Sequence, residues 1–208
     1  MTVVEIIDKI VAWAKVEICE KVKLKVPPDD YEESNSAGYQ YTLATPACFP
    51  LFLPSKEKLP PSIHSPFPSI CVRILEGEDD LTNSTGNITI EFALSTWSTG
   101  THGNDIYLPD EKNKGSMHRW TGAEADAYFN RAYEGWRDIW NFVDTVIRAV
   151  ESTMTIDGIE VDRAAGVKFY PFKEQEAIPD FYPFWFAGVQ FSVKRTIVRN
   201  IPELEDLL

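Results

Sequence analysis

The chain has 208 residues, of which 44% are hydrophobic and 25% are charged, values that are typical of one globular domain. Its formal net charge of -12 disfavours nucleic-acid binding through a broad basic face, so specific binding to nucleic acid is not expected. The first ten residues include Glu5 and Asp8 and do not resemble a secretory signal. No apolar run approaches the roughly 20 residues of a membrane span, so we expect no membrane partner.

The first predicted element is a helix from Thr2 to about Glu20. Apolar residues recur there at spacings of three and four, and Thr2 with Glu5 forms a capping-box pattern at its start. Residues 21–26 then alternate lysine with apolar residues, which fits a short edge strand or an exit loop.

A proline-rich stretch follows, over about residues 27–68. It holds nine of the fourteen prolines, which excludes a long regular element, although a short strand near 47–53 fits the pattern. Its aromatic content is too high for a flexible linker. We therefore predict an extended arm that packs on a neighbouring subunit through Tyr31, Tyr39, Tyr41 and Phe52.

Two strands and a long loop are predicted next. Residues 69–75 and 87–94 are short apolar or alternating runs. Between them, Glu76, Glu78, Asp79 and Asp80 predict an exposed acidic turn. Residues 95–119 show no periodicity and predict a long loop, with Trp97 and Trp120 at its edges as candidate interface residues because tryptophan is enriched at interfaces.

The second half of the chain contains the clearest helix. It is predicted over about 122–151, begins at a capping box from Thr121 to Glu124, and presents Trp136, Trp140, Val143 and Ile147 on one face. Strands are predicted at 166–172 and 184–193, and the pair Asp157 and Gly158 predicts a hairpin turn.

These elements predict an α+β fold in one domain over 1–208. We expect a mainly antiparallel sheet, flanked by the N-terminal helix and the long helix, with extended loops.

No motif for catalysis, a cofactor or a metal is visible, so none of the three is predicted. The sequence lacks a nucleophile elbow, a P-loop and a dinucleotide fingerprint. His102 and His118 flank a loop with Asp105, Asp110 and Glu111, but their spacing matches no metal-ligand pattern. The number of cysteines is odd: Cys19, Cys48 and Cys71. We interpret them as small apolar residues of a protein in a reducing compartment.

Three stretches together resemble tail-terminator or tail-completion proteins of tailed phages and prophages. They are the strand and acidic run of residues 71–80 with the strand 88–94, the helix of residues 133–148, and the aromatic run of residues 181–193. The resemblance covers about half of the chain, from residue 70 onward without the 95–119 loop. The proline-rich stretch departs from the compact members of that family.

The resemblance implies a structural role without catalytic residues. Members have a central sheet flanked by helices and assemble as rings at the head-proximal end of the tail. The implied partners are further copies of the chain, as a hexameric ring, together with the tail tube protein and the head–tail connector proteins. The implied location is the virion tail, assembled in the cytoplasm of the bacterial host. The open alternatives are a monomeric, non-catalytic binding module and an enzyme with an unrecognised site.

The charge generates the first testable prediction. At physiological salt the isolated chain should not bind double-stranded DNA with submicromolar affinity, because an acidic surface repels the phosphate backbone. A fluorescence titration measures this directly. Tight binding that weakens steeply with added salt would contradict the prediction.

Overall fold

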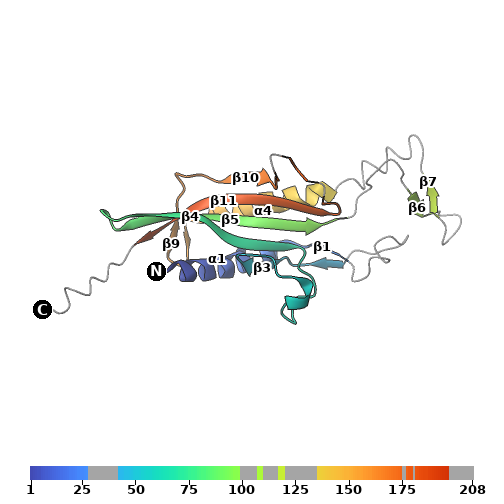
Figure 1. Cartoon of the computed structure of the whole chain (residues 1–208), viewed down its shortest axis with the longest axis horizontal. Helices are drawn as coiled ribbons and strands as arrows, with labels where there is room; N and C mark the ends of the chain where they lie inside the picture. The colour runs from blue at the N-terminus through green and yellow to red at the C-terminus, as the bar shows by residue number, and fades with distance from the viewer. Residues whose placement is uncertain are drawn as a thin grey trace, which may run out of the picture.

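Figure 1 shows the computed structural model of the chain. The structure describes residues 1–27, 42–98, 107–109, 117–119, 135–174, 177–179 and 181–196. In chain order its elements are α1 (Val3–Glu17), the 3-10 turn η1 (Cys19–Lys21), β1 (Leu24–Val26), β2 (Thr42–Ala44), β3 (Ala47–Pro50), the 3-10 turn η2 (Lys56–Lys58), β4 (Ser69–Asp80), β5 (Thr85–Trp97), β6 (Tyr107–Pro109), β7 (Met117–Arg119), α4 (Gly135–Ser152), β8 (Thr155–Ile156), β9 (Ile159–Val161), β10 (Lys168–Pro171) and β11 (Phe184–Thr196).

The main sheet has the order β3-β4-β5-β11-β9-β8, and β10 also pairs with β11. Its strands pair antiparallel, except that β3 runs parallel to β4. β10 and β9 follow one another along the same side of β11, opposite residues 187–190 and 193–194. The predicted α+β class with a mainly antiparallel sheet is confirmed.

One apolar core joins both helices to the same face of the sheet. Alternate residues of the central strands face the helices, as the two-residue period of a strand requires. Trp13 of α1 stacks on Phe92 of β5 with ring centroids 6.3 Å apart, and Phe92 lies opposite Val189 in the next strand. The core side chains of the three central strands are Ile70, Val72, Ile88, Ile90, Phe92, Leu94, Ala187, Val189, Phe191 and Val193.

Several local predictions are confirmed. The capping box of α1 is present, since the Thr2 hydroxyl accepts from the Glu5 backbone N–H and the Glu5 carboxylate accepts from the Thr2 backbone N–H. The hairpin turn between β8 and β9 has positive φ at both Asp157 (43°) and Gly158 (84°), as a type I′ turn requires.

The predicted face of the long helix is partly wrong. The described helix begins at Gly135, and residues 122–134 of the prediction, with the capping box, lie outside the described residues. Trp136 is 39% exposed and Trp140 is only partly buried. The buried side of α4 is formed by Ile139, Phe142, Val143, Val146 and Val150. The core face is therefore rotated away from the tryptophans, which lie at its border.

The acidic run does not form the predicted turn. β4 continues through it to Asp80, so residues 76–80 are exposed positions of a long hairpin with β5. The turn lies at residues 81–84, where the Asp80 carboxylate accepts from the backbone N–H groups of Thr82 and Asn83. Figure 1 shows this hairpin reaching beyond the start of α1. The β4 residues there are all exposed, which removes the apolar alternation that marks a strand in a sequence.

The bounds of the two predicted irregular segments also change. Within the proline-rich stretch, β3 joins the main sheet and buries Cys48 and Phe49, so this part of the arm belongs to the fold. The predicted loop at 95–119 begins later, because β5 extends to Trp97, and β6 pairs with β7 inside it. Residues 28–41 lie outside the described residues.

The core generates the second prediction. Phe142→Ala should lower the free energy of unfolding by about 3–5 kcal/mol, because the Phe142 ring is fully buried and its loss leaves a cavity. The matched control, Trp136→Ala in the same helix, should cost less than about 1 kcal/mol. Denaturant melts at low protein concentration measure both changes. Equal losses would contradict the described helix face.

Candidate functional site

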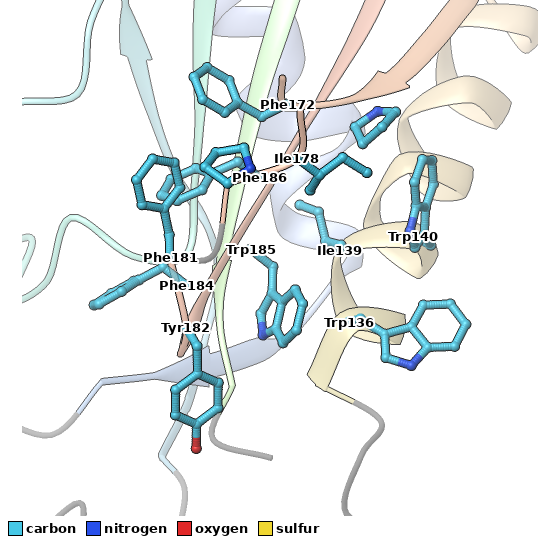
Figure 2. A pocket seen from close by; sticks show the side chains of 12 residues that line it. Trp136, Ile139, Trp140, Phe172, Ile178, Phe181, Tyr182, Phe184, Trp185 and Phe186 are labelled. Carbon is cyan, nitrogen blue, oxygen red and sulfur yellow. The ribbon is translucent and has the colours of Figure 1, made fainter. Parts of the chain in front are cut away.

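An aromatic pocket of about 370 Å³ lies at the edge of the sheet where α4 and β11 begin. Figure 2 shows its three walls, which come from the first turns of α4, from the chain between β10 and β11, and from the start of β11. Its lining residues are Trp136, Ile139, Trp140, Pro171, Phe172, Ile178, Pro179, Phe181, Tyr182, Phe184, Trp185 and Phe186.

The start of β11 supplies side chains to both sides of the sheet. Trp185 points toward α4, whereas Phe184 and Phe186 point to the opposite face, because successive residues of a strand alternate (Figure 2). Phe172, Phe181 and Phe186 form a ring cluster with centroids 5.6–6.2 Å apart. These spacings are those of favourable edge-to-face and tilted aromatic pairs, so this wall is held by its own contacts.

Polar contacts fix the α4 side of the pocket. The Lys25 ammonium lies 3.2 Å from the Asp138 carboxylate and 3.0 Å from the Ser98 hydroxyl. The Trp185 indole N–H donates to the Ser98 carbonyl over 3.3 Å. Gly135 abuts the same serine, since a Cβ there would lie 3.1 Å from Ser98 atoms. Ser98 therefore ties the first turn of α4 to β1 and to β11.

The pocket is an exposed apolar surface. Ile178 is 69% exposed, and Trp136, Phe172 and Phe181 are also exposed. The described lining contains no acid, base or nucleophile other than the Tyr182 hydroxyl. What it offers chemically is apolar contact area, and exposed apolar clusters of this kind mark interaction surfaces.

A groove on the sheet face opposite the helices adjoins the pocket and shares Phe172 and Phe186 with it. Leu51, Phe52 and Leu53 lie at one wall, and Tyr170 and Phe172 at the other. Its floor carries polar residues of β4 and β5, including Ser69 and Ser95, whose buried hydroxyls are 2.6 Å apart.

A buried carboxylate is the centre of that floor. Glu91 is 6% exposed, lies 2.6 Å from the Arg73 guanidinium and accepts a 2.6 Å hydrogen bond from the Tyr170 hydroxyl. Burial and this bond raise the pKa of Tyr170. The Tyr170 ring lies over Gly188, where a Cβ would come within 2.5 Å of it, so only glycine fits beneath the ring. Burial also raises the pKa of the Cys71 thiol to about 11.

The predicted interface residues differ in their exposure to solvent in the structure. Phe52 is 69% exposed, as an interface residue requires. Trp97 is 3% exposed and packs inside the subunit, because β5 continues through it and pairs it with Phe184. It is therefore not available to a partner in this structure. Tyr31, Tyr39, Tyr41 and Trp120 lie outside the described residues.

The predicted acidic surface is exposed along β4. Asp79 is held by Arg195 of β11, and Glu76, Glu78 and Asp80 also lie at exposed positions. Among the described residues, no three His, Cys, Asp or Glu side chains are grouped as metal ligands. His118 lies in β7, and His102, Asp105, Asp110 and Glu111 are outside the described ranges.

Sequence reasoning missed the aromatic pocket, although a signal was present. Eight of the eighteen residues from 169 to 186 are aromatic, which is more than one half-buried strand can place in a core. The three walls come from segments that contact only after folding. The surplus of aromatic residues before and at the start of β11 would have indicated an aromatic surface there.

No family model, curated protein or solved structure matches the chain. Neither helix in the described part of the chain combines the length and the apolar character needed to cross a bilayer.

The groove generates the third prediction. Tyr170→Phe should lower the free energy of unfolding by about 1–3 kcal/mol at pH 7, because the buried Glu91 carboxylate loses a donor. The pKa of Tyr170 is higher in the folded than in the unfolded state. Its protonated hydroxyl therefore stabilises the fold fully at pH values below the unfolded pKa of about 10, and this stabilisation is lost as the pH rises above that value. The stability gap between wild type and variant should therefore narrow above about pH 10. Denaturant melts across pH 7–11 that show a constant gap would contradict this.

Proposed function

We propose that this chain is a non-catalytic structural subunit of a phage or prophage tail. Copies of it close into a ring, by the family resemblance a hexamer, that caps the tail tube and joins the tail to the head. Its partners are its own copies, the tail tube protein and the head–tail connector proteins. It assembles in the bacterial cytoplasm and stays in the virion tail.

The observation that carries the proposal is the exposed aromatic pocket. Its described lining is apolar, in a chain whose net charge is -12. Burying such a surface stabilises an assembly by roughly 25 cal/mol for each Å² removed from water, whereas leaving it exposed favours uncontrolled association. This arrangement fits a subunit that is free in solution before assembly and buries its aromatic pocket when it assembles.

The acidic hairpin supports the same proposal. Glu76, Glu78 and Asp80 lie at exposed positions of β4, in the hairpin whose end extends beyond the start of α1 (Figure 1). Negative charge repels a phosphate backbone at long range. A ring that turns this hairpin toward its lumen lets DNA pass without binding it.

A monomeric binding module is the second candidate, because the aromatic pocket also fits an apolar segment of a different protein. Sedimentation over a wide concentration range, with and without purified tail tubes, distinguishes the two. A ring subunit self-associates under at least one of these conditions, and a binding module stays a monomer in all of them.

The function itself generates the fourth prediction. Inactivating the gene in the phage or lysogen that carries it should give tails without defined ends and heads that remain unjoined, as seen by electron microscopy. Wild-type protein supplied in trans should restore joined particles. Trp136→Ala combined with Phe181→Ala should restore far fewer, because the variant loses the aromatic contact area.

The matched control is Leu75→Ala, which removes an exposed apolar side chain from β4, outside the aromatic pocket. It should restore particles as well as the wild type does. Normal, infectious particles made without any functional copy would contradict the proposed function.

A further inference from the structure

We infer that the aromatic pocket of one subunit receives the turn formed by Leu51 and Phe52 of a second copy of this chain. This inference rests on the proposed function, because it names the contact through which neighbouring subunits of the ring meet.

The turn has an unusual backbone. The Leu51 N–H continues the β3–β4 ladder by donating to the Val72 carbonyl over 2.8 Å, and the Phe52 N–H then donates to the Pro50 carbonyl over 2.8 Å. Leu51, between them, has a φ of 65°. A three-residue turn around a non-glycine residue with positive φ is rare and strained, and such strain clusters at functional positions.

The strained turn presents apolar side chains to solvent. Leu51 is half exposed, and Phe52 is among the most exposed large hydrophobic residues of the described chain. Neither exposure contributes to the stability of the isolated subunit. The strained backbone destabilises the isolated subunit. Burial of both side chains against a partner surface would offset this cost in the assembly.

The turn and the pocket lie at opposite edges of the sheet. The turn follows β3, which is one edge strand, and the pocket adjoins β10 and the start of β11 on the other side. Four strand spacings of about 4.8 Å separate β3 from β10, which gives roughly 19 Å. Two different patches at opposite edges are what a head-to-tail ring contact requires.

The size of the pocket suits this occupant. An apolar cavity of about 150 Å³ is enough to hold a benzene ring. The pocket of about 370 Å³ therefore accommodates the Phe52 ring together with the Leu51 side chain.

A mixed cross-linking experiment tests the contact. One preparation carries Phe52→Cys, and another, of different tag mass, carries Ile178→Cys. The three native cysteines are buried and do not compete. With a short bis-maleimide, under conditions where wild-type protein self-associates, the mixture should give a cross-linked heterodimer and neither variant alone should give a dimer. Leu75→Cys in place of Phe52→Cys is the matched control and should not cross-link to Ile178→Cys.

A second variant measures the strength of the contact. Phe52→Ala should weaken self-association by about 30-fold or more in sedimentation, as the loss of a buried aromatic anchor does.

The outcomes separate the inference from the proposed function. If wild-type protein self-associates but the mixture cross-links no better than the Leu75→Cys control, the contact is wrong and the ring stands. If Phe52→Cys cross-links to itself, the contact is a two-fold one and the inference is overturned. If wild-type protein self-associates neither alone nor on tail tubes, both the inference and the proposed function fail.

Discussion

The antiparallel pairing of β5 with β11 over thirteen residues decides where the other described elements lie. Because side chains alternate along a strand, this one register sends one set of side chains toward the helices and the other set to the opposite face. A slip by one residue would exchange the two sets. The core, the groove and one wall of the aromatic pocket are consequences of the same alignment.

On the helix side the alignment produces a continuous apolar layer, for which Phe92 opposite Val189 is representative. On the other side it places Glu91 opposite Gln190 and next to Gly188, the residue that leaves room for the Tyr170 ring. The buried carboxylate is tolerated there because Arg73 compensates its charge and the Tyr170 hydroxyl donates a hydrogen bond to one of its oxygens. At its start, β11 supplies three aromatic side chains to the pocket.

Local sequence patterns correctly predicted the features that depend on interactions between neighbouring residues. The capping box of α1 and the type I′ turn at Asp157 and Gly158 depend on neighbouring residues only, and both are confirmed. The face of α4 was predicted only in part, because Trp136 and Ile139 are both apolar and only the position of the sheet decides which of them is buried. The extension of β4 was missed because its charged residues pair in a hairpin without entering a core.

The candidate site was less predictable than the fold. Exposure of Phe52 followed from its place in a proline-rich stretch, but the positive φ of Leu51 that holds the turn is visible only in the structure. Trp97 looked like a loop residue because the sequence around it has no periodicity. It is buried because long-range pairing with Phe184 carries β5 through it. Folding likewise brings the first turns of α4 against the aromatic stretch 169–186, so this stretch alone does not show the whole pocket.

The central claim is that the aromatic pocket and the Leu51–Phe52 turn are buried together between copies of this chain. Hydrogen exchange measured by mass spectrometry, on dilute monomer and on assembled protein, tests it most directly. Assembly should slow exchange in peptides that cover residues 51–55 and in peptides that cover 136–140 and 181–186, and it should leave the hairpin turn at 81–84 unchanged. Unaltered exchange at both the turn and the pocket, with protection confined to other surfaces, would contradict the account.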